Sequence, residues 1–511
     1  MNSLRIEGLR MRFDTAIHGG TRGLGITVAL FFFSVVTRGA DSQVHTQPDL
    51  VLVVTDDQRP DTIHALGNSG IRTPSLDRLV RSGVTFRRAY TGYPICYASR
   101  AQLLTGCNVF TALRDYPRSQ VRDSLATLAG TLGKAGYTTV YSGKWHNDGN
   151  PLTRGYQQVA GLYSAGGAKH IVMPSVDQRG MPLTGYRGWT FKDSQNQPRL
   201  ELGVGLRPDN SEIIGQEVVR VIDEAEQSDP LFLHVNFAFP HDPRQWPESM
   251  PNAYSPEECS LPSNFRTDHG FDHGNEGGRD EVLLPRPLKP LQVQAELALY
   301  YAMISDVDQQ VGRIIKALER TGRLQNTVFI FTSDQGLALG SHGLLGKQNQ
   351  YEHSIRSPLI VAGPRGLVGS GLAIDESLVA SSEILVGREV DALVELSDLF
   401  PTLCDFAGVP VPATVEGASL LPVLTGKETR VHDVVCGVFT DTQRMICDDR
   451  WKFILYPKVG RQQLFDLRED PHELVNRVDD PDCQNHRVRL QRQLDTWRLK
   501  SKDPLLPRST R

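Results

Sequence analysis

DLVLVVTDD, residues 49–57, is the stretch that decides the fold. Its apolar run, residues 50–54, shows no polar alternation, which is typical of a strand buried on both faces of a parallel sheet. Similar runs occur at residues 138–141, 231–239 and 327–332. Apolar residues at helical spacing lie between these runs, as in the stripe Val307, Val311, Ile314, Ile315 and Leu318. Strands alternating with helices predict an α/β domain in which helices cover both faces of a mostly parallel sheet.

The C-terminal part of the chain has a different pattern. After about residue 405, short apolar runs follow closely on one another, at residues 434–439, 444–447 and 452–456. They predict a small antiparallel sheet, followed by a polar helix at residues 485–500. Two long irregular segments, about residues 150–210 and 240–292, are expected to form functional loops. We therefore expect a signal peptide at residues 1–40, a catalytic domain at 48–404, a C-terminal subdomain at 405–500 and a tail at 501–511.

The composition is that of a folded, slightly acidic protein. Of 511 residues, 39 % are hydrophobic and 22 % are charged, which excludes a disordered chain. With 55 Lys and Arg against 59 Asp and Glu, the net charge is −4, which argues against a nucleic-acid binder. An anionic ligand must therefore meet positive charge that is concentrated locally.

The N-terminus predicts export. Residues 1–23 contain four arginines, and an apolar run follows at residues 24–36. This run is shorter than the about 20 residues that span a bilayer, and it ends near Gly39 and Ala40. A cleaved signal peptide fits this pattern better than a buried or interfacial helix. We expect a periplasmic or secreted protein, or a lysosomal one in a eukaryote, with no stable membrane span.

Reactive side chains directly follow four of the predicted strands. The segments are Thr55–Asp57, Gly143–His146, Pro240–Pro243 and Ser333–Gly336. In a parallel sheet, ligands bind beyond the carboxyl ends of the strands, so these segments are expected to meet. Taken singly, each has a plainer explanation. An Asp after a strand is often a turn or cap residue, Lys144 could be a solvated charge, and His241 could be a surface histidine.

Oxygen-bearing side chains in these segments suit a hard cation. Asp56, Asp57, Asp334 and the amide of Gln335 predict a Ca²⁺ or Mg²⁺ site. The chain contains no CxxC and no HExxH pattern, so the sequence does not indicate a zinc site. Two other acidic residues, Asp306 and Asp308, are expected on the solvated side or in the N-terminal turn of a helix.

Cys96 opens the most specific segment of the chain. Residues 96–106 read CYASRAQLLTG, which resembles the type I sulfatase signature C-x-P/A-S-R-x-x-x-L-T-G. The four strand-end segments resemble motifs of the same family in the same order, and so do GSHGLLGK at 340–347 and LFDLREDP at 464–471. The resemblance covers about residues 48–478. It implies the alkaline-phosphatase-like fold of the formylglycine-dependent sulfatases.

Three features depart from the commonest family pattern. Ala98 replaces the usual Pro of the signature, and Gln335 stands where Asn or His is more usual. DDQRP at residues 56–60 resembles iduronate-2-sulfatase-like members, whereas GKWH at 143–146 resembles arylsulfatase-like and glycan-sulfatase-like members. The subfamily signals are therefore mixed.

The resemblance implies a role for each of these residues. Cys96 is expected to become Cα-formylglycine through a formylglycine-generating enzyme, and the hydrated aldehyde to act as the nucleophile. The implied metal ligands for Ca²⁺ or Mg²⁺ are Asp56, Asp57, Cys96, Asp334 and Gln335. The implied catalytic residues are Cys96, Arg100, Lys144, His146, His241 and Lys347. Among these, the lysines would contact sulfate oxygens, His241 would protonate the leaving alcohol, and His146 would help to expel sulfate.

The implied activity is hydrolysis of a sulfate monoester on a small molecule or glycan. A sulfated carbohydrate is favoured, and an aryl sulfate or choline sulfate stays open. Two alternatives are kept: a phosphodiesterase or phosphonate monoester hydrolase of the same superfamily, and an inactive protein that binds sulfated glycans. In either case no nucleic-acid partner is expected.

The number of cysteines, seven, is odd. At least one therefore stands outside any internal disulfide. The plain interpretation of Cys96 is a buried structural thiol, whereas the family resemblance makes it the residue that is modified. Six cysteines would then remain, and Cys436 and Cys447, which flank a predicted hairpin, are the first candidates for a disulfide.

Overall fold

The computed structural model describes residues 47–118, 120–168, 171, 175–176, 180–368 and 383–506. All of these residues belong to one unit, Gln43–Arg511. The expected signal peptide at residues 1–40 lies outside the described residues. Among the helices of the described ranges, none has the length and apolar character needed to cross a membrane.

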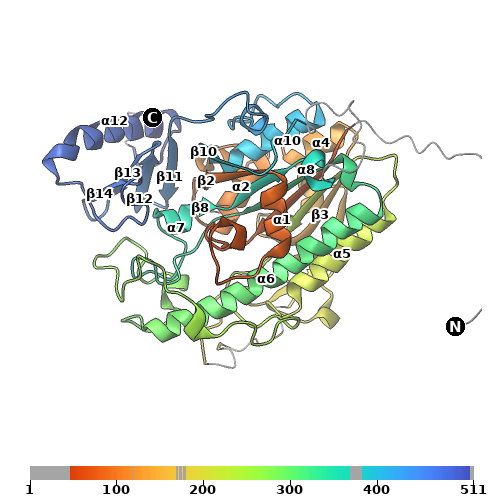
Figure 1. The fold of residues 1–511 in the computed structure, drawn as a ribbon, viewed down its shortest axis with the longest axis horizontal. Coiled ribbons are helices and arrows are strands. Elements are labelled where there is room, and N and C mark those ends of the chain that lie inside the picture. Colours follow the sequence, from red (N-terminus) through yellow and green to blue (C-terminus); the bar gives the residue numbers. More distant parts are fainter. Residues whose placement is uncertain are drawn as a thin grey trace, which may run out of the picture. The chain divides into compact units, whose positions relative to one another are not determined.

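A large, mostly parallel sheet forms the centre of the fold (Figure 1). Its strands are β1 (Asp49–Thr55), β2 (Val84–Tyr90), β3 (Thr138–Trp145), β4 (Gln158–Ala165), β5 (Trp189–Lys192), β6 (Leu231–Asn236), β7 (Thr327–Ser333), β8 (Arg356–Ser357), β9 (Leu359–Ala362) and β10 (Arg388–Glu395). They lie in the order β10-β2-β9-β7-β1-β6-β3-β4-β5, and β8 pairs with β2. The four strands predicted from apolar runs are neighbours, β7-β1-β6-β3, and pair in parallel.

Helices cover both faces of this sheet, as the alternating pattern predicts. The helices are α1 (Pro74–Ser82), α2 (Cys96–Thr105), α3 (Val109–Ala112), α4 (Leu128–Lys134), α5 (Asn210–Glu224), α6 (Pro290–Arg320), α7 (Glu352–Ile355), α8 (Pro364–Val368), α10 (Leu399–Ala407), α11 (Leu421–Leu424) and α12 (Gln484–Lys500). Helices α1, α5 and α6 lie on one face, and α2, α4 and α10 lie on the other (Figure 1).

Strand β1 is buried on both faces because it lies in the middle of the sheet. Val51 and Val53 pack toward α1, α5 and α6, while Leu50, Leu52 and Val54 pack toward α2, α4 and α10. All five side chains have no exposed surface. Burial of each contributes about 1.5–3 kcal/mol, so this strand fixes the segment that follows it, Thr55–Asp57.

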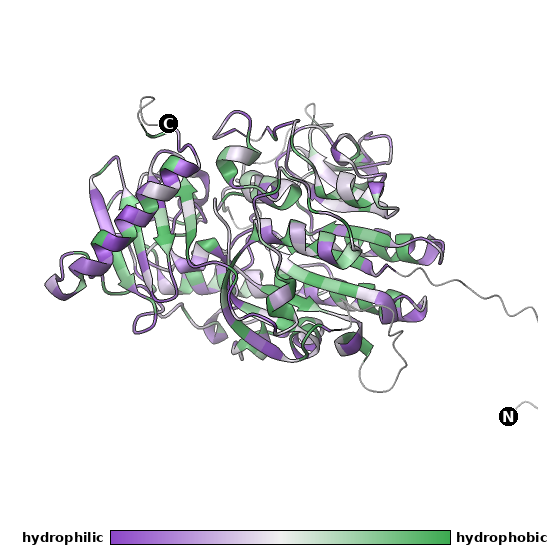
Figure 2. Cartoon of the chain, turned by 90° about the horizontal axis from the view of Figure 1, so that it is seen from above, coloured by the Kyte–Doolittle hydropathy of each residue, from purple (hydrophilic) through white to green (hydrophobic). Residues whose placement is uncertain are grey.

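A smaller antiparallel sheet follows the large one in the chain. Its strands are β11 (Val435–Phe439), β12 (Gln443–Cys447), β13 (Trp451–Tyr456) and β14 (Arg461–Asp466), paired in that order. One face packs on α12, whose outer surface is hydrophilic in Figure 2, and the other packs around Tyr351 and Ile355 near α7. The antiparallel sheet and the C-terminal helix confirm the predicted fold class, whereas the boundary at residues 404–405 stays a prediction.

Several predicted details were wrong. Strand β6 ends at Asn236 rather than at residue 239, although Phe237 and Phe239 still form backbone hydrogen bonds with the end of β1 and the segment after it. Strand β3 continues to Trp145 through residues that were expected to follow it. Asp306 and Asp308 are buried rather than solvated, because α6 packs against other segments on these sides. Asp308 accepts the backbone N–H groups of Ser75 and Leu76 at the start of α1, and Asp306 accepts hydrogen bonds from two serines.

The predicted Cys436–Cys447 disulfide is contradicted by the strand register. Cys447 lies opposite Val435 in the β11–β12 pair, and Cys436 lies opposite Ile446. Because neighbouring residues of a strand point to opposite faces, the two thiols lie on opposite sides of the small sheet. All seven cysteines are among the described residues, and all seven have free, buried thiols.

Candidate active site

Three carboxylates meet where β1 and β7 end. Asp56 and Asp57 follow β1, Asp334 follows β7, and these two strands pair in register up to Thr55 and Ser333. One carboxylate oxygen of each aspartate lies within 4.8 Å of those of the other two. The turn after β1 is fixed by Asp57, which has a positive φ of 69° and donates its backbone N–H to Asp334 Oδ1 at 3.1 Å. The predicted clustering of these aspartates is therefore present in the structure.

The electrostatics of this trio favour a bound cation. Burial raises the pKa of Asp57 to about 7, although Lys347 lowers it, and burial together with the charge of Asp56 raises the pKa of Asp334 to about 6. Burial also acts to raise the pKa of Asp56, but nearby cations, Lys144 foremost, hold it well below its usual value. Oδ1 of Asp56 is buried without a hydrogen-bond partner. Three crowded carboxylates with an unused oxygen form a donor set that suits a hard divalent cation.

Gln335 reaches the trio, but with its amide nitrogen. Nε2 donates to Asp57 Oδ1 at 2.5 Å and to the sulfur of Cys96 at 3.3 Å. The amide oxygen, which was predicted to bind metal, instead accepts a hydrogen bond from Ser99 Oγ at 2.8 Å. A half-turn of the amide would bring the oxygen to the aspartates, and the Ser99 hydroxyl can then accept from Nε2. Its role as a metal ligand stays a prediction.

Cys96 begins α2 and presents its thiol to the same cluster. The sulfur lies within 4.8 Å of an oxygen of Asp56 and a ring nitrogen of His241. Burial, and then the charge of Asp56, raise the pKa of the thiol to about 12. A thiol with such a pKa is protonated at neutral pH, and the thiolate is the nucleophilic form of cysteine. The unmodified side chain is therefore a poor nucleophile in this position.

Arg100 lies one helical turn after Cys96, as the sequence predicts. Its Nε donates to Asp334 Oδ2 at 2.9 Å, and its Nη1 donates to the side-chain oxygen of Asn236 at 2.6 Å. Nη2 also lies 2.9 Å from Asp334 and 3.8 Å from Asp56. Arg100 thus connects α2 to the ends of β6 and β7 and balances part of the carboxylate charge.

Two buried lysines that lie far apart in the sequence contact these carboxylates. Lys144 donates to Asp56 Oδ2, and Lys347 donates to Asp57 Oδ2 at 2.7 Å. Lys144 follows Gly143, where the β3–β4 register shifts because β4 carries the extra residue Gly161; Gly143 has φ +85°, and a Cβ there would lie 1.9 Å from a carbonyl oxygen of β6. These lysines supply the locally concentrated positive charge that a slightly acidic chain needs in order to bind an anion.

Two histidines border the cluster and are neutral. Burial, and then Lys347, lower the pKa of His241, and burial, then Lys144, lower that of His146. His241 Nδ1 lies 2.6 Å from the backbone carbonyl of Asp242, so Nδ1 carries the proton and Nε2 is an acceptor. His146 packs edge-to-face between Tyr97 and Trp189, with its Nδ1 unpaired.

Comparisons with known proteins decide the family. The model of the sulfatase family matches residues 48–409, and the model described as "N-sulphoglucosamine sulphohydrolase, C-terminal" matches residues 340–500. The chain belongs to the sulfatase family. It is therefore a sulfuric ester hydrolase with the alkaline-phosphatase-like fold, as the motifs predicted.

Relatives of this sulfatase cover most of its length. An arylsulfatase of Clostridium perfringens is 28 % identical over 459 residues, which are 84 % of this chain and 90 % of the relative. A choline-sulfatase of Rhizobium meliloti is 27 % identical over 471 residues, 85 % of this chain and 83 % of that one.

Two solved structures show the same fold. A structure described as being in complex with its substrate, D-glucosamine-2-N,6-O-disulfate, aligns with a TM-score of 0.69 at 21 % identity, over 90 % of this chain and 99 % of the other. A phosphonate monoester hydrolase from Silicibacter pomeroyi also has a TM-score of 0.69 at 21 % identity, over 90 % and 96 % of the two chains.

The structure of the sulfatase adds site residues that the motifs did not reveal. Tyr186 donates its hydroxyl to Asp56, and Gly185 lets this segment approach His241, because a Cβ there would lie 2.4 Å from the carbonyl oxygen of Asp242. Arg279 donates to His241 Nε2 at 3.0 Å. Both segments lie in the long irregular stretches that were expected to be functional, and that was the only signal the sequence offered for them.

Residue 342, which lies within the matched motif at 340–347, does not join the site. His342 stacks on Tyr351 at 4.1 Å between ring centroids, and its Nε2 lies 3.0 Å from the carbonyl oxygen of Glu473. Because that carbonyl can only accept, Nε2 carries the proton. His342 therefore connects the Lys347 loop to the C-terminal subdomain.

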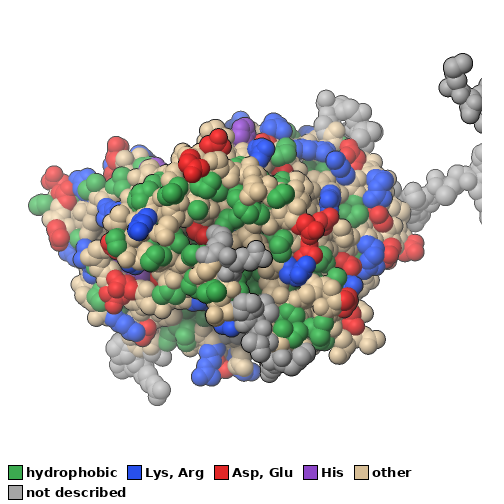
Figure 3. Space-filling view, turned by 90° about the horizontal axis from the view of Figure 1, so that it is seen from below, with side chains coloured by type: hydrophobic (Ala, Val, Ile, Leu, Met, Phe, Trp, Pro, Cys, Tyr) green, Lys and Arg blue, Asp and Glu red, His purple; other side chains and the backbone are tan. Residues whose placement is uncertain are grey.

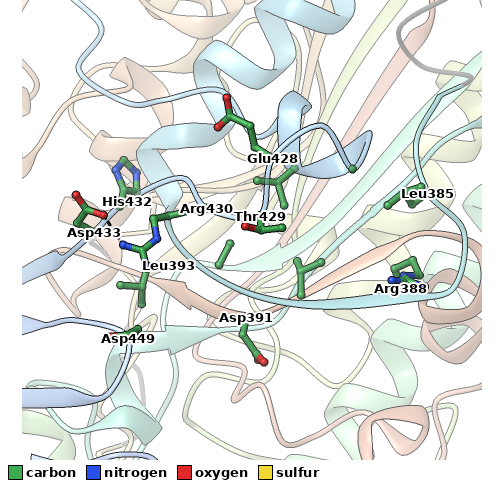
Figure 4. Close-up of a pocket in the computed structure, with 14 residues that line it drawn as sticks. Leu385, Arg388, Asp391, Leu393, Glu428, Thr429, Arg430, His432, Asp433 and Asp449 are labelled. Carbon is green, nitrogen blue, oxygen red and sulfur yellow. Dashed lines mark hydrogen bonds and ion pairs between the residues drawn. The ribbon is translucent and has the colours of Figure 1, made fainter.

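The structure also contains a cavity at the edge of the large sheet. It has a volume of about 490 Å³ and runs along the edge strand β10 (Figure 4). His432 lies 2.8 Å from Asp398, and Arg430 lies 2.6 Å from Asp433. None of the predicted site residues lines this cavity. On the face seen in Figure 3, basic and acidic side chains are interspersed, so no strongly basic patch appears there.

Proposed function

We propose that this sulfatase hydrolyses a sulfate monoester of a carbohydrate, using a Cα-formylglycine made from Cys96 and a divalent cation. The observation that carries the proposal is that the Cys96 sulfur, an Asp56 oxygen and a His241 nitrogen lie within 4.8 Å of one another. A nucleophile, an anionic metal ligand and a proton-transfer group thus share one small volume. The thiol itself is unsuited to attack, since its pKa is about 12.

The metal would be held by Asp56, Asp57 and Asp334, with Gln335 as a fourth ligand after its amide turns. When bound, Ca²⁺ or Mg²⁺ would neutralise a sulfate oxygen and lower the pKa of a coordinated hydroxyl. Lys144 and Lys347 already contact two of these aspartates, so they lie where sulfate oxygens would approach the metal. Arg100 would hold Asp334 in place and stabilise the nucleophile beside it.

The residue at position 96 would supply two hydroxyls once converted and hydrated, one that attacks sulfur and one whose deprotonation releases sulfate. His241, which has a ring nitrogen within 4.8 Å of the Cys96 sulfur, would take up a proton at Nε2 when the anionic sulfate binds and then give it to the leaving alcohol, with Lys347 near it. His146 has a free Nδ1 and would accept the proton of the second hydroxyl. A single hydroxyl, as on serine, lacks this second proton and would retain the sulfate.

Two comparisons support a carbohydrate substrate. The matched C-terminal family model is described by an N-sulphoglucosamine hydrolase, and one structural neighbour is described with a disulfated glucosamine as its substrate. Export, predicted from residues 1–40, and maturation by a formylglycine-generating enzyme are part of the same proposal. Phosphonate monoester hydrolysis is the second candidate, because a phosphonate monoester hydrolase shares the fold.

The test compares wild type, Cys96→Ala and Cys96→Ser after co-expression with a formylglycine-generating enzyme. Wild type is expected to hydrolyse 4-nitrophenyl sulfate repeatedly and a phosphonate monoester much more slowly. Cys96→Ala should be inactive, and Cys96→Ser should take up one sulfate on residue 96, visible by mass spectrometry. Multiple turnovers by Cys96→Ala, or faster turnover of the phosphonate, would contradict the proposal.

A further inference from the structure

We propose that Arg279 is a specificity-determining residue that binds a second anionic group of the substrate, a sulfate or carboxylate beside the sulfate that is hydrolysed. This inference rests on the proposed function and deepens it, because it selects polyanionic carbohydrates over singly charged sulfate esters. No motif in the sequence points to Arg279, and its role comes from its contacts and its exposure.

Arg279 opens a short 3-10 helix, Arg279–Val282, at the border of the site. Its Nε donates to Asp280 Oδ1 at 2.5 Å, and its Nη2 donates to His241 Nε2 at 3.0 Å. Asp280 is in turn fixed by Gln348 at 2.9 Å and lies 3.7 Å from Lys347. The arginine is therefore anchored at its Nε end beside the catalytic loop, while its Nη end reaches the proposed proton donor.

Arg279 differs from the other cations of the site in its exposure. Its side chain is 41 % exposed, whereas those of Lys144, Lys347 and Arg100 are 0 %, 1 % and 4 % exposed. The three buried cations are paired with the carboxylates of the trio. Arg279 is paired with Asp280, and its Nη2 lies 3.8 Å from Asp242 Oδ1, but its Nη1 makes no hydrogen bond with a described residue. Arg279 thus presents positive charge from the site to solvent, at the place where a substrate would enter.

The contact with His241 cannot persist when substrate binds productively. Nδ1 of His241 carries its proton toward the carbonyl of Asp242, so Nε2 has one lone pair, and Arg279 occupies it. A leaving oxygen must lie within hydrogen-bonding distance of Nε2 to exchange a proton with it. The Nη end of Arg279 must therefore move away, while its Nε can stay on Asp280, and the guanidinium then faces the leaving group.

The chemistry of the guanidinium determines which substrate group can take the place of His241 as its hydrogen-bond partner. A planar fork of N–H donors matches a carboxylate or sulfate through two parallel hydrogen bonds, and such charge-assisted bonds are stronger than those to hydroxyls. A neutral sugar would leave the displaced Nη groups to water, with the guanidinium held only through Nε by Asp280. A sugar that carries a second sulfate or a uronate carboxylate near the leaving oxygen would compensate the displacement fully.

The experiment measures kcat/KM for substrates that differ in one anion. The pairs are N-acetylglucosamine 6-sulfate with glucosamine 2-N,6-O-disulfate, and a sulfated uronate disaccharide with its carboxyl-reduced form. The singly charged reference is 4-nitrophenyl sulfate. The variants are Arg279→Gln and Arg279→Lys, and Arg266→Gln is the matched control, because Arg266 is an exposed arginine of the same long loop.

For Arg279→Gln we expect kcat/KM to fall about 10- to 100-fold on the more highly charged member of a pair, and less than about 3-fold on 4-nitrophenyl sulfate. Arg279→Lys should lie between wild type and Arg279→Gln, and Arg266→Gln should match wild type. The sugar pairs distinguish a sulfate from a carboxylate as the second anion. An equal loss on all substrates, or an unchanged preference in Arg279→Gln, would overturn the inference.

Failure of the proposed function would give a different result. If wild type hydrolyses none of these esters, the proposed activity is wrong, whatever the state of Arg279. Affinities for the same sugar pairs, measured by calorimetry with Cys96→Ala, still decide the role of Arg279. The inference is supported if Cys96→Ala binds the sugar with the second anion more tightly than its partner sugar and Cys96→Ala/Arg279→Gln does not. It is refuted if each sugar binds with the same affinity to the two proteins.

Discussion

Replacement of Lys347 by methionine tests the electrostatics of the site most sharply. The ammonium group is 1 % exposed and lies 2.7 Å from Asp57 Oδ2 and 3.7 Å from Asp280 Oδ2. Methionine has a similar length and fills the same volume, so Lys347→Met removes the charge with little change in packing. Lys289→Met is the matched control, because Lys289 is exposed before α6.

The expected loss of stability follows from the burial of the pair. Removal of one partner from a buried ion pair costs about 3–5 kcal/mol, because the other charge is left unpaired. Asp57 can escape this cost by binding a proton. Burial raises its pKa to about 7 even with Lys347 present, and loss of Lys347 would raise it further. The loss in the free energy of unfolding should therefore be about 3–5 kcal/mol at pH 8 and smaller at pH 6.

The assay is urea unfolding of the chelator-treated protein at both pH values, together with turnover of the metal-loaded enzyme. We expect kcat to fall about 10²- to 10³-fold, as for loss of one group that stabilises a charged transition state. Lys289→Met should match wild type in both measurements. Wild-type stability at pH 8 and a kcat within 3-fold of wild type for Lys347→Met would refute this account of the site.

Further predictions concern the His432–Asp398 pair, the thiols and the metal. Burial lowers the pKa of His432, but its hydrogen bond to Asp398 raises the pKa to about 9. The variant His432→Gln should therefore lose up to about 3 kcal/mol of stability below pH 6.5 and nothing above about pH 9. Equal losses of stability across this pH range would contradict the pairing. Denatured protein without reductant should titrate seven thiols before conversion of Cys96 and six after it, and two fewer would reveal a disulfide. Chelation should lower thermal stability, and a cation at 100 times its Kd should restore about 2.7 kcal/mol, whereas an unchanged melting temperature would argue against the trio as a metal site.

The central fold and the core of the site could be predicted because the relevant signals are local. The run at residues 50–54 identifies a buried strand without any partner, and Asp56 and Asp57 follow it directly. Position in a parallel sheet then brings them to Asp334, since the strand ends share one edge. Cys96 and Arg100 are one helical turn apart, so their shared face follows from the helix itself.

The remainder depends on contacts between distant segments. Tyr186 and Arg279 lie in irregular stretches whose paths have no periodic signal, although they contact Asp56 and His241 directly. The orientation of the Gln335 amide depends on Ser99, a neighbour in space rather than in sequence. The thiols of Cys436 and Cys447 were expected to pair because they flank a hairpin, but a register shifted by one residue places them on opposite faces.

The central claim is that residue 96 works as an aldehyde and not as a thiol. The measurement that tests it most directly is mass spectrometry of the peptide containing residue 96, made on preparations with different degrees of maturation and combined with kcat on 4-nitrophenyl sulfate. We expect kcat to rise in proportion to the fraction of formylglycine and to extrapolate to zero when only cysteine is present. Full activity in a preparation whose residue 96 is entirely unmodified cysteine would contradict it.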